Sequence, residues 1–286
     1  MATELEIKLT LSEQAQSQAL SWLLAQQEAR AGGCKTLVNR YYDTPDADLN
    51  KARAALRVRQ AGDRYIQTLK TQGEFVGGAH RRQEWEWPLE GPELDLALLK
   101  QTPISEQVNL DDLRLAFETN FQRQIVMLEA GPSVIEVAVD SGDVLGGGHA
   151  MPLHEVEFEL KGGEPGELLR WARALALQVP VFLNLISKAE QGYYLADIYR
   201  PEVFVPGDAL SISGLLRLLS VSWLTGDVLK LSPSALIGID DKARHAGFET
   251  LWSSVSARLL EGVTVNSLLG EHQELGVLQL ALADQG

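Results

Sequence analysis

The amino-acid sequence predicts an α+β fold: a closed eight-stranded antiparallel β-barrel, or tunnel, surrounded by helices and followed by a small all-α C-terminal region. Three observations predict it. Short segments alternate charged and apolar residues, each segment carries mostly one sign of charge, and segments with helical periodicity lie between and after them. A period of two is typical of strands whose two faces meet different environments.

The first strand shows the pattern most clearly. Glu4-Leu5-Glu6-Ile7-Lys8 places three charged side chains on one face and its aliphatic side chains on the other. Two glutamates at this spacing repel by about 2 kcal/mol at an effective dielectric constant of 20. Such a strand would destabilise itself unless cations lie opposite its charged face.

The same alternation recurs in acid-rich or arginine-rich blocks. The blocks are residues 56–59, 82–87, 135–140 and 155–160, with 66–70 and 121–125 between them. Closing the sheet would bring acidic and basic faces together around a water-filled tunnel and would leave no exposed strand edge. The apolar faces would then point outward and need helices packed on them.

The remaining elements follow in chain order. An amphipathic helix is expected over 11–31, capped by Ser12 and stopped by Gly32 and Gly33. Further strands are expected around 36–43, 53–60, 64–71, 81–89, 121–129, 133–140 and 153–161, which makes eight with the first. Helices are expected around 94–100, 110–119, 163–177 and 187–199.

The chain divides into two parts. Residues 1–200 form the predicted tunnel domain, and residues 201–208, with two prolines and a glycine, are a plausible linker. Residues 209–286 are rich in leucine and serine with helical periodicity, and we expect three or four helices near 209–230, 241–261 and 264–282.

Composition excludes several classes of protein. The net charge of −14 argues against a general nucleic-acid binder, and no segment approaches the ~18 consecutive apolar residues that span a membrane. The N-terminus lacks the pattern of a signal peptide, and the single cysteine, Cys34, fits a cytoplasmic protein without disulfides. Because basic residues concentrate on the predicted inward faces, we expect a small anionic ligand as the partner.

The ordered motifs resemble the CYTH superfamily, the triphosphate tunnel metalloenzymes. The resemblance rests on the blocks above together with Tyr41-Tyr42-Asp43-Thr44 and Ser187-Lys188, and it covers residues 1–200. These motifs are most similar to those of bacterial inorganic triphosphatases that join a CYTH domain to a helical CHAD domain. Here the helical region is short, acidic and poor in histidine, so it is either a reduced CHAD-like remnant or an unrelated helical cap.

The resemblance implies metal-dependent hydrolysis of inorganic triphosphate to pyrophosphate and phosphate inside the tunnel. Arginine forks and lysine ammonium groups suit phosphate oxygens, and carboxylates suit Mg²⁺ or Mn²⁺. The predicted substrate-site residues are Lys8, Arg57, Arg59, Lys70, Arg82, Arg123 and Lys188. The predicted ligands of two metal ions are Glu4, Glu6, Glu84, Asp140, Glu155 and Glu157, and metal roles for Glu86, Glu136 and Glu159 stay open.

Other functions remain as alternatives. The same tunnel could serve a class IV type adenylyl cyclase, or a thiamine or nucleoside triphosphatase. A polyphosphate-binding module without turnover is an alternative of another class, and the helical tail could form a homodimer. No GxxxxGK[ST], HExxH or GxSxG motif is present, which leaves P-loop, zinc-hydrolase and serine-hydrolase chemistry without support.

Overall fold

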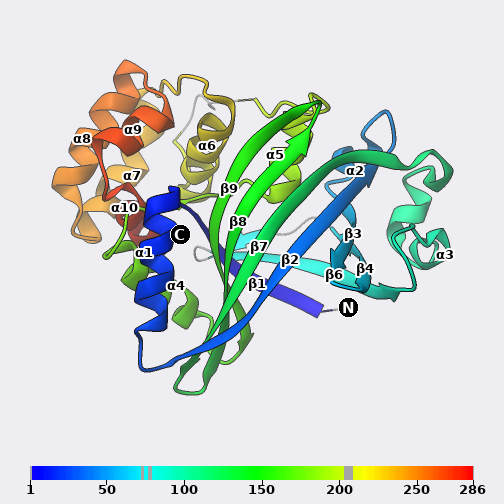
Figure 1. Ribbon diagram of the computed structural model, residues 1–286. Coiled ribbons are helices and arrows are strands. Elements are labelled where there is room, and N and C mark those ends of the chain that lie inside the picture. The colour runs from blue at the N-terminus through cyan, green and yellow to red at the C-terminus, as the bar shows by residue number, and fades with distance from the viewer. Residues whose placement is uncertain (1, 72–73, 77–78, 203–208, 286) are drawn as a thin grey trace.

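The computed structural model describes the backbone of residues 2–71, 74–76, 79–202 and 209–285 (Figure 1). Within these ranges the side chains of residues 2–4, 74–76 and 79–83 lie outside the description. The side chains of Glu4 and Arg82, both predicted site residues, therefore fall outside the described part of the protein, and their roles stay predictions.

One antiparallel sheet dominates the described chain. Its strands are β1 (Ala2–Thr10), β2 (Ala29–Asp43), β3 (Ala55–Ala61), β4 (Arg64–Lys70), β5 (Glu74–Val76), β6 (Ala79–Leu89), β7 (Arg114–Ala130), β8 (Ser133–Gly146), β9 (His149–Gly162) and β10 (Phe182–Leu183). Their order is β10-β1-β9-β8-β7-β2-β3-β4-β6-β5, and β1 also pairs with β6. An α+β fold with a large antiparallel sheet is thus confirmed, and β5 and β10 add two short strands to the predicted eight.

Helices surround the sheet and form the C-terminal region. They are α1 (Glu13–Leu24), α2 (Asp48–Lys51), α3 (Leu96–Leu99), α4 (Gly166–Ala176), α5 (Lys188–Leu195), α6 (Ile212–Thr225), α7 (Pro233–His245), α8 (Glu249–Glu261), α9 (Val265–Glu271) and α10 (Leu275–Ala283). None of these described helices has the length and apolar character needed to cross a bilayer. The region after residue 209 holds α6 to α10, more than the three or four helices predicted.

The first predicted helix is correct at its start and wrong at its end. Ser12 caps α1 by accepting a hydrogen bond from the Ala15 backbone N–H, but the helix ends at Leu24 and β2 begins at Ala29. Pairing with β7 overrides the helical pattern, because the chain can satisfy its backbone groups on a neighbouring strand. Gly32 allows this approach: a Cβ there would lie 2.8 Å from the side chain of Ile125.

The helix predicted over 110–119 is also wrong. Only a short 3₁₀ turn, Leu110–Asp112, forms there, and β7 begins at Arg114. From Arg114 onward the residues pair with β2 and β8, so the long β2–β7–β8 ladder sets the conformation of this segment. Long-range pairing of this kind leaves little trace in local sequence periodicity.

The main hydrophobic core lies on the outer face of the sheet. Ile7, Val137 and Phe158 point outward from β1, β8 and β9 and pack with residues of α1, α4 and the C-terminal helices. Figure 1 shows α1, α4 and α7 to α10 gathered on the side of the sheet away from β3 and β4. The Gln279 side chain of α10 hydrogen-bonds both the N–H and the C=O of Leu183 in β10. The C-terminal helices therefore share one core with the sheet; residues 203–208 of the predicted linker lie outside the described residues, and the domain limits stay predictions.

Candidate active site

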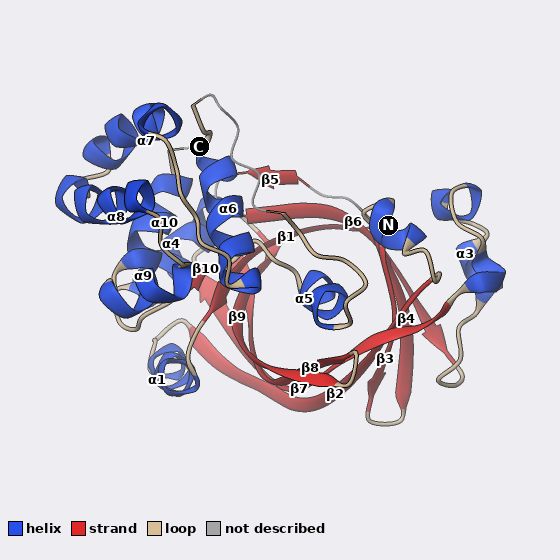
Figure 2. Ribbon diagram, turned by 90° about the horizontal axis from the view of Figure 1, so that it is seen from above, coloured by secondary structure: helices blue, strands red, loops and turns tan. Residues whose placement is uncertain are grey.

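A cavity of about 800 Å³ lies on the inner face of the sheet. Figure 2 shows α5 inside the curve of the sheet, where its residues contact β7, β8 and β9. Predicted site residues that line this cavity are Glu6, Lys8, Arg57, Arg59, Lys70, Glu84, Arg123, Glu157 and Lys188. Asp140 and Glu155 are buried behind these side chains, and both form ion pairs with Lys188, which lines the cavity. The strand alternation of the sequence thus places the described site residues of the strands on one side of the sheet.

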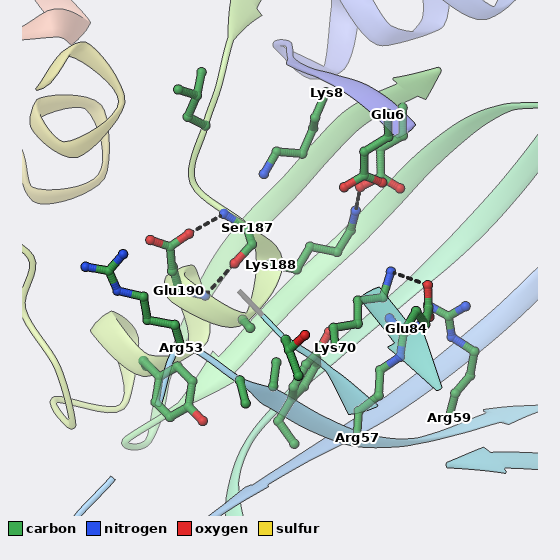
Figure 3. Close-up of a pocket in the computed structure, with 18 of the residues that line it drawn as sticks. Glu6, Lys8, Arg53, Arg57, Arg59, Lys70, Glu84, Ser187, Lys188 and Glu190 are labelled. Atoms are coloured by element: carbon green, nitrogen blue, oxygen red, sulfur yellow. Dashed lines mark hydrogen bonds and ion pairs between the residues drawn. The ribbon is translucent and has the colours of Figure 1, made fainter. Parts of the chain in front are cut away.

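Lys188 occupies the centre of an acidic group. Its Nζ lies 3.0 Å from Asp140 Oδ2, 2.6 Å from Glu155 Oε2 and 2.7 Å from Glu157 Oε1. Ser187 caps α5 in a capping box with Glu190, so the helix begins at Lys188 and directs this side chain at the strands. Figure 3 shows the lysine crossing the cavity from α5.

Arg123 of β7 meets the same carboxylates from the other side. Its Nε and Nη2 donate to the two oxygens of Asp140 at 2.7 and 2.6 Å, and Nη2 also donates to Glu157 at 2.7 Å. Asp140 is fully buried, and the register explains the fork because Arg123 lies directly opposite Asp140 on the β7–β8 ladder. A bidentate fork of this kind is strong and geometrically specific.

Charges in this group balance. Asp140, Glu155 and Glu157 face three cations, since Lys8 Nζ lies 3.8 Å from Glu155 in addition to the Lys188 and Arg123 contacts. Burial alone would raise the pKa of Glu157, but the charges of Lys188 and Arg123 outweigh burial and hold that pKa well below its ordinary value. Burial lowers the pKa of Lys8, with partial opposition from Glu155.

The opposite wall carries an excess of positive charge. Burial, together with repulsion from Arg57 and Arg123, lowers the pKa of Arg59 to about 9. Arg59 Nε donates to Asn39 at 2.7 Å, which aims its guanidinium, whereas Arg57 Nε has no hydrogen-bond partner among the described residues. Lys70 lies 3.2 Å from Glu84, as drawn in Figure 3. A buried donor that lacks a partner next to crowded cations is what an anion would satisfy.

Comparisons with known proteins identify the family of the chain. The profile of the CYTH domain matches residues 2–193. The chain belongs to the CYTH domain family. An inorganic triphosphatase of Haemophilus influenzae is 35% identical over 209 residues, which is 68% of this chain and 55% of that protein. The chain thus spans about half the length of this curated relative.

A solved CYTH-like structure shows the same fold. It is that of a candidate adenylyl cyclase from Hippeastrum, described as having a dominant triphosphatase activity. The TM-score is 0.50 at 18% identity, and the match covers 67% of this chain and 95% of the other. At this identity the likeness concerns the fold, and the predicted family resemblance is confirmed by the domain match.

Enzymes of the triphosphate tunnel type in the CYTH family depend on metal ions, and the oxygen donors here fit a hard cation. Cross-strand register places Glu6 opposite Glu159 and Glu159 opposite Glu136, so three acids lie in a row across β1, β9 and β8. Like charges directly opposite each other destabilise a sheet, and Lys161 contacts Glu159 at 2.6 Å and Glu136 at 3.6 Å. No three carboxylate, histidine or cysteine side chains converge as a complete ligand set in the described residues. A hard divalent cation is still compatible with this lining, because such an ion can take one or two carboxylates and complete its shell with water and phosphate oxygens.

Sequence reasoning missed several residues that shape the CYTH cavity. Gln16 of α1 donates to the backbone carbonyls of Asp140 and Glu155 at 2.6 and 3.1 Å, which ties the helix to the acidic group from outside. Lys161 extends the β9 pattern by one alternation and could have been found from it. Arg217 reaches the cavity from α6, and no local signal in a leucine-rich helix marks it.

Proposed function

We propose that this CYTH protein hydrolyses inorganic triphosphate to pyrophosphate and phosphate in the cavity on the inner face of its sheet. The observation that carries the proposal is the pairing of a cation-rich wall, Arg57 and Arg59, with a carboxylate-rich wall across one cavity. Phosphoryl transfer needs positioning and charge neutralisation more than covalent chemistry, and both walls supply these. The name of the Haemophilus influenzae relative, an inorganic triphosphatase, supports the same reaction.

We propose further that the eight main strands close into a tunnel. Hydrogen-bonded pairs between β1 and β6 support closure, because they connect the two ends of the series β1-β9-β8-β7-β2-β3-β4-β6. The view in Figure 2, in which these strands curve around α5, supports it as well. A closed tunnel would hold the anion away from bulk water, where its interactions with arginine are stronger.

The cationic residues would have two different roles, binding of phosphate oxygens and positioning of the acidic group. Arg57 and Arg59 would bind terminal phosphate oxygens, since guanidinium forks match such oxygens and remain charged. Lys70 would add a point charge at the same wall, next to Glu84. Lys188 and Arg123 are already engaged with buried carboxylates, so we assign them to holding the acidic group in place and to orienting the substrate at its edge.

Glu6, Glu159 and Glu136 are the described residues that we expect to hold Mg²⁺ or Mn²⁺, with Glu4 predicted from sequence beside them. The balanced charges around Asp140, Glu155 and Glu157 favour one resident ion at the Glu6 row over a second ion within that group. The metal would neutralise phosphate charge and acidify the attacking water. Glu6 is itself largely buried, which suits a ligand in a site that excludes bulk water.

The test is phosphate release from tripolyphosphate, with ATP, thiamine triphosphate and pyrophosphate in parallel and with Mg²⁺, Mn²⁺ or EDTA. We expect metal-dependent release from tripolyphosphate. Cyclic AMP from ATP would instead identify a cyclase. Tripolyphosphate that raises the melting temperature without any turnover would identify a binding module.

Arg57→Ala provides the matching site test. We expect it to raise KM for tripolyphosphate at least about tenfold, because a buried charge-assisted contact to the anion is lost. Arg30→Ala is the control, since Arg30 forms an exposed pair with Glu129 on the β2–β7 ladder and does not line the cavity. Equal kinetics in both variants would refute the assignment of the site.

A further inference from the structure

The residues that lead into α5 decide where Lys188 lies. Lys188 is the first residue of the helix, directly after the cap Ser187, and its Nζ contacts three carboxylates at 2.6 to 3.0 Å. Because these contacts are short, a small shift of the start of α5 would break the ion pairs of Lys188. Whatever holds residues 184–190 therefore holds the lysine.

Helix α6, in the C-terminal region, holds this segment through polar contacts. The Ser220 hydroxyl accepts a hydrogen bond from the backbone N–H of Leu185 at 3.0 Å, and Ser220 is fully buried. Arg217 Nη1 donates to the backbone carbonyl of Leu185 at 3.4 Å, and Arg217 Nη2 donates to Glu190 Oε1 at 2.6 Å. Both backbone groups of Leu185 and the capping-box glutamate of α5 are thus bound by one helix.

Apolar packing adds to these bonds. Ile186, which is fully buried, lies in a small cluster with Val221 and Leu224 of α6. Burial alone would raise the pKa of Glu190, but the charge of Arg217 and its hydrogen bond lower that pKa, so the pair stays ionised at neutral pH. The contacts run along successive turns of α6, at Arg217, Ser220, Val221 and Leu224, which is one face of a helix.

We propose that α6 positions Lys188 and that Arg217 is a positioning residue of the site, which makes the C-terminal helical region a working part of the CYTH active site. This inference rests on the proposed function for its effect on turnover. Arg217 acts on the reaction through Glu190, Ser187 and the start of α5. Its side chain also borders the cavity, so the test separates action through Lys188 from direct contact with the substrate.

The first arm of the test compares Arg217→Ala with Arg173→Ala. Arg173 is an equally exposed arginine, at 38%, whose pair with Asp284 also joins the sheet side of the molecule to the C-terminal region, but it does not line the cavity. We expect Arg217→Ala to lower kcat for tripolyphosphate about tenfold with KM changed less than about threefold, because misplacement by a fraction of an ångström is costly in a preorganised site. Arg217→Lys, which keeps the charge beside Glu190, should restore most of the rate, and Arg173→Ala should match the wild type.

The second arm repeats Arg217→Ala in a Lys188→Met background. If Arg217 acts through Lys188, the double variant should lie within about twofold of Lys188→Met alone, since residues that act as one unit are not additive. A full further tenfold loss in the double variant would overturn the proposal in favour of direct substrate contact. Wild-type kinetics in Arg217→Ala would overturn it as well.

Hydrogen exchange provides a readout that needs no turnover. In Arg217→Ala the amides of residues 185–190 should exchange at least about tenfold faster than in the wild type, while those of β8 and β9 stay unchanged. Unchanged exchange at 185–190 would overturn the positioning role. If wild-type protein releases no phosphate from any triphosphate, the proposed function fails, and the exchange result still decides whether α6 holds the start of α5.

Discussion

Replacing Lys188 by methionine removes the ammonium that three buried carboxylates share. Asp140 and Glu157 would keep Arg123, and Glu155 would keep Lys8 at 3.8 Å, so the group would hold one uncompensated negative charge. Removing one partner of a buried ion pair costs about 3–5 kcal/mol of unfolding free energy. Lys188 is only 8% exposed, so water does not screen this loss.

The destabilisation should depend on pH with a defined sign. The pKa of folded Glu157 lies well below its ordinary value of 4.5, because the charges of Lys188 and Arg123 outweigh burial. A depressed carboxyl pKa contributes stability that is present above the unfolded pKa and is lost as the pH falls through the folded pKa. Without Lys188 the folded pKa of Glu157 rises. The difference in unfolding free energy between the variant and the wild type should therefore be largest near pH 7 and should become smaller as the pH falls below about 4.5.

Urea unfolding followed by tryptophan fluorescence at about pH 7 and about pH 4 measures this difference. Lys161→Met is the control, because Lys161 also contacts two carboxylates but is 38% exposed, and such a pair contributes at most about 1 kcal/mol. If Lys188→Met lost no more unfolding free energy than Lys161→Met, the reasoning would be refuted. An equal loss at both pH values would refute the electrostatic cause.

Substitutions at Glu6, Gly192 and Tyr193 each change one local feature of the cavity or of α5. Glu6→Gln should lower the rate at limiting Mg²⁺ at least about tenfold with partial recovery at excess Mg²⁺, because a charged oxygen ligand is lost; an unchanged Mg²⁺ titration would contradict this. Gly192→Ala should destabilise by about 1–3 kcal/mol, because its Cβ would overlap the ring of Phe117; an unchanged thermal midpoint would count against this packing. Tyr193→Phe should cost about 1–3 kcal/mol in urea unfolding, because its hydroxyl donates to buried Asp43 at 2.7 Å, and no loss would mean that another donor replaces it.

The sequence predicted the strand faces well and the strand ends poorly. Charged and apolar residues alternate with a strict period of two, so the inward position of Glu6, Arg57 and Glu157 follows from the chain itself. The lengths of β2 and β7 do not follow from the local sequence, because residues near 29 and 114 become strand only by pairing with distant segments. Local propensity and tertiary pairing disagree at these places, and the pairing prevails.

The candidate site divides in the same way. The identity of its charged residues could be read from strand alternation and from the family motifs, and most of those that the structure describes line one cavity. The ion-pair partners of these charged residues could not be predicted from the sequence. The sequence treats Asp140, Glu155 and Glu157 as metal ligands, whereas the folded chain brings Arg123 and Lys188 within 3.0 Å of them.

By itself the sequence determined the class of fold, the sign of charge on each strand face and the membership of the CYTH family. These features follow from local periodicity and from ordered motifs, which need no knowledge of distant contacts. Only the tertiary structure decided which carboxylates are neutralised by lysine and arginine, and that a helix after residue 209 holds the start of α5. Register and packing bring a lysine and its carboxylate together across more than a hundred residues of chain, as between Lys8 and Glu155, and no periodicity within either segment records that pairing.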